Sequence, residues 1–477
     1  MSADNTLTGS PPGPPLLPHA SPQGGAVLMI PLMLVLFVTN LDQTSVAVAL
    51  PSIAADLHGT ADASWVVTAY LLTGAVTTLI FGKLGDMFGR KRVLQIALAA
   101  FVLGSLLCAV ADSITALVLF RALQGVGGLT SLVLTITGDL VPARQRATYQ
   151  AATVAVSMVA LVAGPLLGGA FSQGLSWRWI FYVNLPIGVV AFLSIGALLH
   201  LPHRRSTAQP DIAGALAVTV FTTAALLATT WGGHTHPWSS PPVLGLMALS
   251  LIALAVYLAV ERRAAAPITP LHLFRSGAFS LAAVQYLIAT LVLFAAMLYV
   301  PMFLQSVQNR SAVVAGMFVV PLLVGLVAVT LITGPLITRS GRYKPYPVAG
   351  AAFAAAAMYC LGQADRNTSD LALLLPLMAA GAGLGLVMQV CLLAGQNAVD
   401  HRDLGAATST LVFFRSMGGA FGAAVFGAVL SARLADVPAA AGDHSQAFQL
   451  VFLLTVPCLL LSFALALLME EKPLAER

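Results

Sequence analysis

Charge is scarce in this chain. Of its 477 residues, only 9% are Asp, Glu, Lys or Arg, against about a quarter in an ordinary soluble domain. Hydrophobic side chains make up 58% of the residues, and the mean hydropathy is +0.90. A water-soluble globule is therefore excluded, and the composition predicts an all-α polytopic membrane protein.

Cysteine is also rare, and histidine is confined to the breaks between apolar stretches. The four cysteines lie inside apolar stretches without CxxC spacing, which predicts small hydrophobic residues in helices rather than disulfides or metal ligands: Cys108, Cys360, Cys391 and Cys458. None of the nine histidines falls within a predicted span, although His200 borders the sixth. We therefore expect no metal site and no cofactor. The 23 Lys and Arg residues form no continuous basic face, so no nucleic-acid partner is expected.

The first 25 residues contain no Lys or Arg and are rich in Pro, Gly and Ser. They lack the basic segment that opens a secretory signal peptide. We expect a disordered tail over 1–25.

Long apolar runs are abundant. About 20 apolar residues suffice for a helix to cross a bilayer, and the chain contains fourteen such runs. The predicted spans are 26–50, 64–81, 93–111, 114–138, 149–171, 180–199, 212–230, 241–260, 278–303, 312–338, 346–363, 371–396, 405–431 and 447–469.

The positions of Lys and Arg predict the orientation, because cytoplasmic loops retain positive charge. With the N-terminus inside, seventeen of these residues fall in inner segments, and the outer loops hold only Arg178, Arg310, Arg366 and Arg433. The excess of Lys and Arg on one side is obtained only if the number of spans is even. Both termini are therefore expected to be cytoplasmic.

The loop between the second and third spans combines three glycines, four cations and one carboxylate: Gly82, Lys83, Gly85, Asp86, Gly89, Arg90, Lys91 and Arg92. A shift of 252 residues places it on Gly334–Lys344. The matched positions, including Leu84 with Leu336, are Gly82, Gly89, Arg90 and Arg92 with Gly334, Gly341, Arg342 and Lys344, and Thr338 stands opposite Asp86. The shift equals eight spans, which predicts two six-helix bundles separated by an inserted pair.

The pattern G-x-L-x-D-x-x-G-R-[KR]-x in this loop resembles the signature loop of the major facilitator superfamily (MFS), and the 6+2+6 plan is similar to its fourteen-helix drug:proton antiporter branch. The resemblance implies the MFS fold, with a bundle over 26–200, two inserted helices and linkers over 201–275, a second bundle over 276–469, and a short cytoplasmic tail over 470–477. It also implies a conformational latch in which Asp86 accepts hydrogen bonds from helix-end amides and Arg90 neutralises it. The expected latch residues are Gly82, Gly85, Asp86, Gly89, Arg90, Lys91 and Arg92.

Charges within hydrocarbon are costly and indicate function. Three lie inside the predicted spans: Asp42, Arg121 and Arg415. Asp42 lies ~24 Å along the first span and Arg121 ~10 Å below the outer end of the fourth, at comparable depths. Burial raises the pKa of a carboxyl group and a neighbouring guanidinium lowers it, so a movable contact of this kind can couple protonation to conformation. A static ion pair is the alternative.

Four further motifs resemble those of the same exporters. Leu41–Pro51 is similar to L-D-x-T-x-V-x-V-A-L-P, with Ala47 in place of the usual Asn, and Arg121–Gly128 is similar to R-x-x-Q-G-x-G, which implies proton transfer by Arg121. Gly164–Gly169 resembles the G-P-x-x-G-G motif of antiporters and predicts a hinge at Gly164, Pro165, Gly168 and Gly169. Trp177–Gly188 resembles W-R-W-I-F-x-x-N-x-P-x-G, whose aromatic residues predict an anchor at the membrane surface.

Arg415 lies near the middle of the thirteenth span, in a half of the chain whose spans contain no acidic residue. It is expected to contact backbone carbonyls, Gln389 or water, or an anionic or polar group of the substrate. The residues predicted to line a substrate cavity are Gln124, Gln285, Tyr299, Gln389, Phe414 and Arg415.

These features predict a monomeric, multi-pass transporter of a bacterial cell membrane, not an enzyme. It is expected to export small amphipathic or hydrophobic drugs in exchange for protons by alternating access, with protons as the coupling ion. Export of an endogenous metabolite is an open alternative. A membrane enzyme or channel would require a catalytic pair or a ring of polar residues, and neither is visible.

Overall fold

The computed structural model describes residues 22–58, 63–199, 211–233, 236–436 and 444–471. Within these ranges the chain is helical and contains no β-strand. Thirteen segments are long and apolar enough to cross a membrane, and the shorter helix Pro345–Leu361, with 17 residues, occupies the position of the eleventh predicted span. The all-helical, fourteen-span prediction is confirmed.

The first half of the chain forms one bundle. Its helices are α1 (Pro22–Asp56), α2 (Ala63–Phe88), α3 (Arg90–Ala109), α4 (Ile114–Gly125), α5 (Leu129–Leu140), α6 (Ala143–Gly174) and α7 (Trp179–Leu198). The helix α1 packs against α6 and α7, and α3 packs against α4 and α7. Two buried apolar clusters, one around Phe101 and one around Phe181, fill the space between them.

The second half forms the other bundle. Its helices are α10 (Gly277–Ser306), α11 (Ala312–Met317), α12 (Val319–Ser340), α13 (Pro345–Leu361), α14 (Asp370–Asn397), α15 (Leu404–Asp436) and α16 (Ser445–Leu468), with short 3₁₀ turns at Leu271–Arg275 and His401–Asp403. The largest apolar cluster of the molecule lies almost entirely within this bundle.

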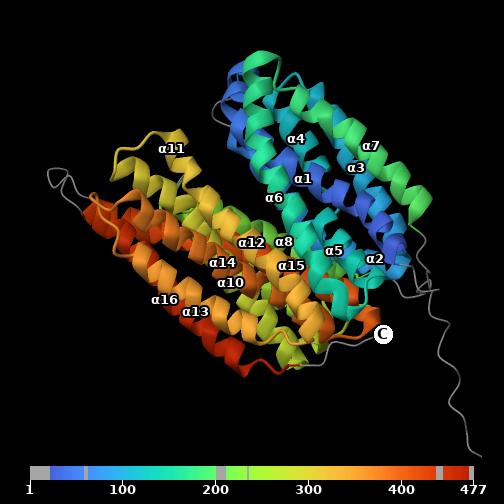
Figure 1. The fold of residues 1–477 in the computed structure, drawn as a ribbon. Helices are drawn as coiled ribbons and strands as arrows, with labels where there is room; N and C mark the ends of the chain where they lie inside the picture. The colour runs from blue at the N-terminus through green and yellow to red at the C-terminus, as the bar shows by residue number, and fades with distance from the viewer. Residues whose placement is uncertain (1–21, 59–62, 200–210, 234–235, 437–443, 472–477) are drawn as a thin grey trace, which may run out of the picture.

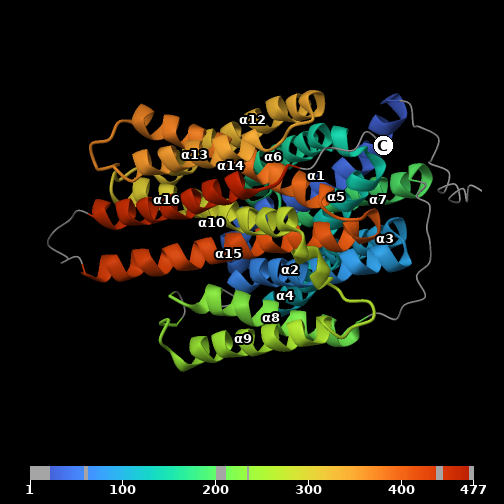
Figure 2. The ribbon, with the colours of Figure 1, turned by 90° about the horizontal axis from the view of Figure 1, so that it is seen from below.

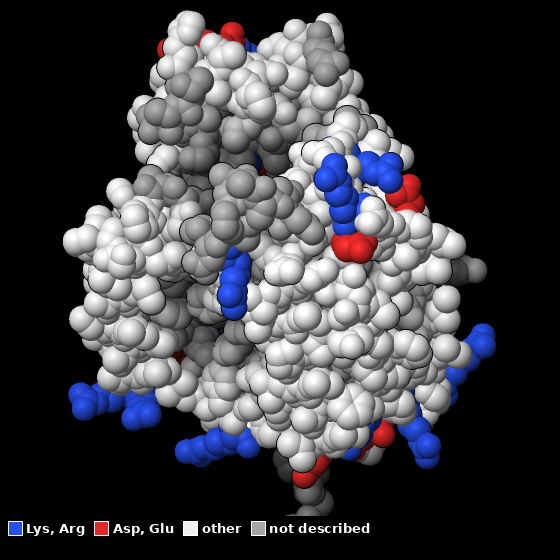
Figure 3. All heavy atoms as spheres, turned by 90° about the vertical axis from the view of Figure 1, so that its left-hand side faces the viewer, with Lys and Arg blue, Asp and Glu red and all other residues white. Residues whose placement is uncertain are grey.

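The inserted helices α8 (Ile212–Trp231) and α9 (Pro241–Glu261) form a hairpin along one side of the molecule (Figure 2). Only α8 contacts both bundles, through α2 and α15, and it shares a small apolar core with Leu79 of α2 and Phe413 of α15. The outer face of α9 is exposed, with Leu251 at 67% and Ile252 at 62%. Charged side chains are few on the face in Figure 3, which leaves broad uncharged areas suited to lipid contact.

The fourth span differs from the single helix expected over 114–138. It is broken into α4 and α5 at Gly127 and Gly128, whose φ angles are +128° and +53°. A Cβ atom on Gly128 would lie 2.6 Å from the Thr78 backbone, so the break lets the chain approach α2 closely. The Gly127 amide donates to Thr77 Oγ1 at 3.0 Å. This hydrogen bond replaces the helical one that the amide loses at the break.

The two bundles converge at one end and diverge at the other (Figure 1). The polar contacts between them join the end of α2, the first turn of α5 and the start of α6 to the end of α12, the C-terminal part of α14 and the start of α15. All of these segments lie on the side predicted to be cytoplasmic. The structure is therefore closed on that side.

The predicted tails fall mostly outside the described residues. Only the last part of the 1–25 tail is described, and there α1 already begins at Pro22 rather than at residue 26. Of the 470–477 tail, 472–477 lie outside the described residues. Glu471 is not free, because its Oε1 accepts hydrogen bonds from the Tyr343 amide at 2.7 Å and the Lys344 amide at 3.2 Å.

Candidate functional site

A buried ion pair lies within the first bundle. Asp42 projects from α1 and Arg121 from α4, and Arg121 Nη1 donates to Asp42 Oδ2 at 2.5 Å. Both side chains are 0% exposed. The structure thus brings together the two charges that sequence depth placed at the same level.

Two amides complete the coordination of the Asp42 carboxylate. Gln124 Nε2 donates to Asp42 Oδ1 at 2.9 Å, and Asn184 Nδ2 from α7 donates to the same oxygen at 2.7 Å. Gln124 also accepts from Arg121 Nη1 at 2.7 Å and donates to Ser105 Oγ on α3 at 2.8 Å. Four helices therefore supply a closed polar network around one carboxylate.

Arg121 is held on its other side by a carbonyl and an aromatic ring. Its Nε donates to the Val66 carbonyl at 3.1 Å, and its guanidinium carbon lies 4.3 Å from the centroid of the Tyr70 ring. Arg121 Nη2 is buried and has no hydrogen-bond partner. Neutralising Asp42 would leave this cation without a counter-ion in a dry site, which costs about 3–5 kcal/mol for a buried pair. Loss of the Asp42 charge would therefore destabilise this arrangement of the helices.

The sequence did not predict three members of this network, which are Asn184, Ser105 and Tyr70. A fourth member, Gln124, was predicted to line a substrate cavity instead. The signal for Asn184 was present in the motif Trp177–Gly188, where it is an embedded amide. That motif predicted only a surface anchor, and the structure adds a polar contact to the buried carboxylate.

The glycines of α6 form a close seam with α1 beside Asp42. A Cβ atom on Gly164 would lie 1.8 Å from Thr44 Oγ1, and one on Gly168 would lie 2.5 Å from the Ser45 carbonyl oxygen. Ser45 Oγ donates to the Gly164 carbonyl at 2.9 Å, and Pro165 lies inside the continuous helix. Gly169 has no neighbour within 4 Å of such an atom. The seam therefore rests on Gly164 and Gly168.

This difference gives a matched pair of substitutions. We expect Gly168→Ala to destabilise the protein by about 1–3 kcal/mol, because the methyl group meets backbone that must move. Gly169→Ala should leave stability unchanged or slightly increased. Thermal unfolding of both variants in the same detergent, followed by tryptophan fluorescence, measures the difference. Equal midpoints for the two variants would contradict the seam.

The loop predicted to be a latch joins the two bundles on the closed side. Asp86 Oδ1 pairs with Arg90 Nη2 at 2.9 Å, and Asp86 Oδ2 accepts from the Ala406 amide in the first turn of α15 at 3.0 Å. Arg90 also pairs with Asp139 at the end of α5. The carboxylate thus lies at the positive end of a helix in the opposite bundle.

The remaining latch residues differ in their contacts. A Cβ atom on Gly82 would overlap Ser409 Oγ at 1.8 Å, and Gly89 has a φ of +96° between α2 and α3. Gly85 lies against Leu132, since a Cβ atom there would be 3.3 Å from its side chain. Lys91 Nζ donates to the Gly196 carbonyl of α7 at 2.8 Å. Arg92 is exposed.

The repeated loop makes the corresponding contact without a charge. Thr338, which stands opposite Asp86 in the repeat, lies 2.9 Å from Thr148 through their hydroxyl oxygens. A Cβ atom on Gly334 would lie 2.9 Å from the Ala147 carbonyl of α6. Gly334 thus packs closely against α6 of the first bundle, just as Gly82 packs closely against α15 of the second. The two contacts are related by the repeat, and the first carries the ion pair of Asp86 with Arg90.

Neutral side chains close the space between the two loops. Gln150 Nε2 donates to Gln396 Oε1 at 3.1 Å, Gln389 Nε2 donates to the Ala147 carbonyl at 3.1 Å, and the hydroxyls of Ser131 and Ser409 lie 2.6 Å apart. Gln389 was assigned to a substrate cavity. In this conformation it is a contact between the bundles.

The other predicted cavity residues lie in the second bundle. Gln285 is 0% exposed, and neither polar atom of its side chain has a hydrogen-bond partner. Tyr299 donates to the Ala423 carbonyl, and the Phe414 ring lies 6.2 Å from that of Phe274. Arg415 is partly buried beside the Tyr286 hydroxyl. The structure does not bring these residues together with Asp42. No group of three or more His, Cys, Asp or Glu suited to a metal occurs among the described residues.

A family model for the major facilitator superfamily matches residues 32–423. The chain belongs to the major facilitator superfamily. It is 38% identical over 497 residues to an uncharacterized MFS-type transporter of Mycobacterium tuberculosis, covering 97% of this chain and 72% of that protein. It is 36% identical to the multidrug transporter protein MdtP of Bacillus subtilis, covering 85% and 75%, and 35% identical to the efflux pump dotC of Dothistroma septosporum, covering 82% and 69%.

Solved structures agree on the fold. The human organic anion transporter MFSD10 superposes with a TM-score of 0.66 at 16% identity, covering 93% of this chain and 99% of that one. The proton:xylose symporter XylE superposes with a TM-score of 0.62 at 16% identity, covering 95% and 98%. The chain is thus a multi-pass membrane transporter of this superfamily and not an enzyme.

Proposed function

We propose that this MFS transporter exports small amphipathic or hydrophobic compounds in exchange for protons. The observation that carries the proposal is the fully buried pair of Asp42 and Arg121, inside a network that two amides complete. In such a place the charged carboxylate is stable beside Arg121, whereas the neutral, protonated form requires a different arrangement of the neighbouring side chains. Proton binding is thereby linked to conformation.

The conformation supports a direction for the cycle. With the predicted orientation, the closed side is cytoplasmic and both termini lie there. In this scheme a proton reaches Asp42 from outside, the pair with Arg121 separates, and the latch at Asp86 opens as the outer side closes. Release of the proton to the cytoplasm restores the pair after the substrate has been exported.

The substrate class is supported by relatives and by charge. Several relatives are named multidrug transporters or efflux pumps. Asp42 and Glu261 are the buried acidic residues of the described chain, and Glu261 lies at the very end of α9. Among the described residues of the two bundles, Asp42 is the one fully buried carboxylate, and Asp86 and Asp139 lie in the contact on the closed side. No second buried anionic group accompanies Asp42 to bind a dication, so neutral and singly charged compounds fit best. Exchange of one proton for a neutral compound would also draw about 2.3 kcal/mol from each 100 mV of membrane potential.

The proposal includes a monomeric protein of a bacterial cell membrane that needs no cofactor besides the coupling proton. Export of an endogenous metabolite remains the second candidate, because one relative is named the transporter of the acurin A biosynthesis cluster. A panel of cationic dyes, antibiotics and neutral metabolites, each scored for proton release on addition, distinguishes the two.

The direct test uses the purified protein in liposomes with an acidic lumen. We expect a transported dye to accumulate inside and the lumen to become more alkaline as it does so. Collapsing the pH gradient with an ionophore should abolish accumulation. Accumulation with an acidic exterior would indicate symport, and equal uptake with and without the gradient would indicate facilitated diffusion. Either result would contradict proton antiport.

A further inference from the structure

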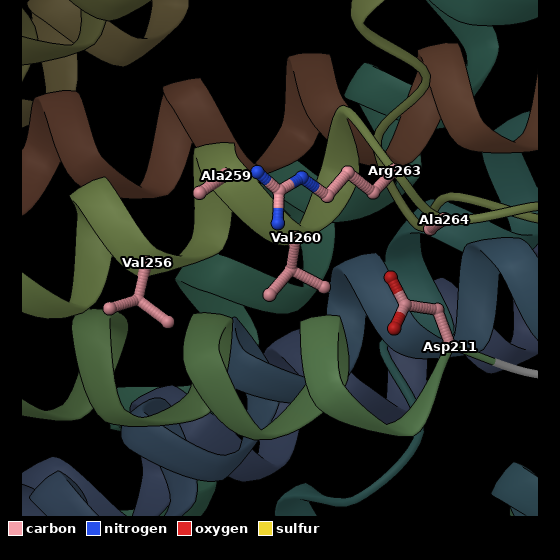
Figure 4. Close-up of a pocket in the computed structure, with 6 residues that line it drawn as sticks. All are labelled: Asp211, Val256, Ala259, Val260, Arg263 and Ala264. Atoms are coloured by element: carbon pink, nitrogen blue, oxygen red, sulfur yellow. The ribbon is translucent and has the colours of Figure 1, made fainter.

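A cavity of about 400 Å³ lies between the two inserted helices, away from the Asp42 network. Its lining comes from the residue before α8, from the last two turns of α9 and from the residues just after α9: Asp211, Val256, Ala259, Val260, Arg263 and Ala264. Figure 4 shows it as a groove between the two helices, with apolar walls along α9 and a charged group on each side. The walls suit a hydrocarbon chain, and the two charges suit a polar end.

The acidic side of the groove has an unused acceptor. Asp211 Oδ1 caps α8 by accepting from the Gly214 amide at 2.8 Å. Asp211 Oδ2 is buried and has no hydrogen-bond partner. Figure 4 shows this carboxylate directed from α8 toward α9. A buried carboxylate oxygen without a donor favours a ligand that supplies a charged N–H group.

The basic side has an unused donor. Arg263 follows the end of α9, and its side chain extends along the groove above Val260 (Figure 4). Within the described residues its guanidinium forms no ion pair, and it does not pair with Asp211 across the groove. A guanidinium in such a position is suited to bind a phosphate.

The depth of the groove in the membrane indicates that a ligand with these charged groups is a lipid. The spans Ile212–Trp231 and Pro241–Glu261 both end at this groove, so it lies at the level of the lipid headgroups whichever way the chain is oriented. Val256 is 49% exposed on the wall that continues toward the membrane interior. A ligand here therefore has its polar end in the headgroup region and its apolar part against α9.

We propose that this groove binds the headgroup of an aminophospholipid, phosphatidylethanolamine. Its primary ammonium donates to Asp211 Oδ2, its phosphate pairs with Arg263, and one acyl chain lies against Val256 and Val260. Phosphatidylcholine carries a phosphate but has no N–H to donate to the carboxylate. Phosphatidylglycerol places an uncharged polyol against the carboxylate and brings no cation. Opposite charges on the two sides of one groove thus favour the zwitterion with a protonated amine.

The test is lipid retention by the full-length protein. We expect native mass spectrometry, with the three lipids supplied at equal concentration, to show phosphatidylethanolamine retained about tenfold more than phosphatidylcholine, the ratio for losing one charge-assisted hydrogen bond. Asp211→Asn, which still caps α8 because Asn is an equally good cap, should remove that preference. Arg263→Gln should weaken retention of both phosphatidylethanolamine and phosphatidylcholine.

The adjacent cation provides the matched control. Arg262→Gln removes the same charge one residue away, at an exposed position outside the groove, and should retain phosphatidylethanolamine as the unmodified protein does. Thermal unfolding of each variant checks folding. Equal retention of the three lipids would overturn the proposal. So would a loss of phosphatidylethanolamine retention in Arg262→Gln as large as that in Arg263→Gln. Equally tight binding of glycerophosphoethanolamine, which lacks acyl chains, would show a site for a soluble ligand instead.

Discussion

Replacement of Asp42 by Asn is expected to reduce gradient-driven accumulation of substrate to the background of empty liposomes. The carboxylate accepts from Arg121 with one oxygen and from Gln124 and Asn184 with the other. An Asn side chain must turn its NH₂ group toward one of these sets of donors, and it cannot change charge. Uptake of a dye into acid-loaded liposomes, with protein orientation and amount matched, gives the measurement.

Loss of activity alone could reflect misfolding, because Asp42→Asn leaves Arg121 buried without a counter-ion, at about 3–5 kcal/mol. The double variant Asp42→Asn with Arg121→Gln removes both charges and should recover most of that stability. We expect it to carry substrate down a concentration gradient and to show no response to a pH gradient. Accumulation that still follows the pH gradient in either variant would exclude Asp42 as the coupling residue.

The sequence located the centre of this site because charge in hydrocarbon is costly. Asp42 and Arg121 stand out in spans that otherwise contain almost no ionisable group, and their distances from the ends of two antiparallel helices place them at one depth. The motif Gly164–Gly169 predicted a hinge with small residues but not the neighbouring helix, which the structure shows to be α1. These inferences need only local spacing and the thickness of the bilayer.

Other parts of the site could not be predicted in this way. Asn184 stands in the motif Trp177–Gly188, which predicted a surface anchor, and its spacing along the chain does not identify Asp42 as its partner. Gln389 was a reasonable cavity residue until its contact with Ala147, 242 residues away, became visible. Contacts between the bundles exist in only one conformation of a transporter, and a sequence encodes all of its conformations at once.

The break in the fourth span lies between the Asp42 network and the closed side of the molecule. Arg121 and Gln124 lie on α4, before the break, whereas Ser131 and Gly138 lie on α5 and face α15 and α14 of the other bundle. The two glycines at 127 and 128 separate these segments, and α5 can therefore change its angle without unfolding α4. We expect rearrangement at Asp42 to reach the inter-bundle contacts by this route.

A disulfide across the closed side should arrest transport almost completely. The hydroxyls of Ser131 on α5 and Ser409 on α15 lie 2.6 Å apart, so cysteines at both positions have their sulfur atoms within bonding reach. The bond would hold the two bundles together on the side that must open for substrate to enter from the cytoplasm. We expect Ser131→Cys with Ser409→Cys, placed in a background with Cys360→Ser and Cys458→Ser, to lose transport on oxidation and to regain it on reduction.

Two comparisons make this result specific to alternating access. Each single cysteine variant should keep its activity under oxidation, which separates the cross-link from oxidation of the thiols alone. Thr148→Cys with Thr338→Cys joins the bundles at the repeat-related contact, where the hydroxyls lie 2.9 Å apart, and should arrest transport in the same way. Since both pairs close the same side through different helices, rapid transport by a fully cross-linked protein at either position would mean that this side need not open, and the exchange mechanism would have to be abandoned.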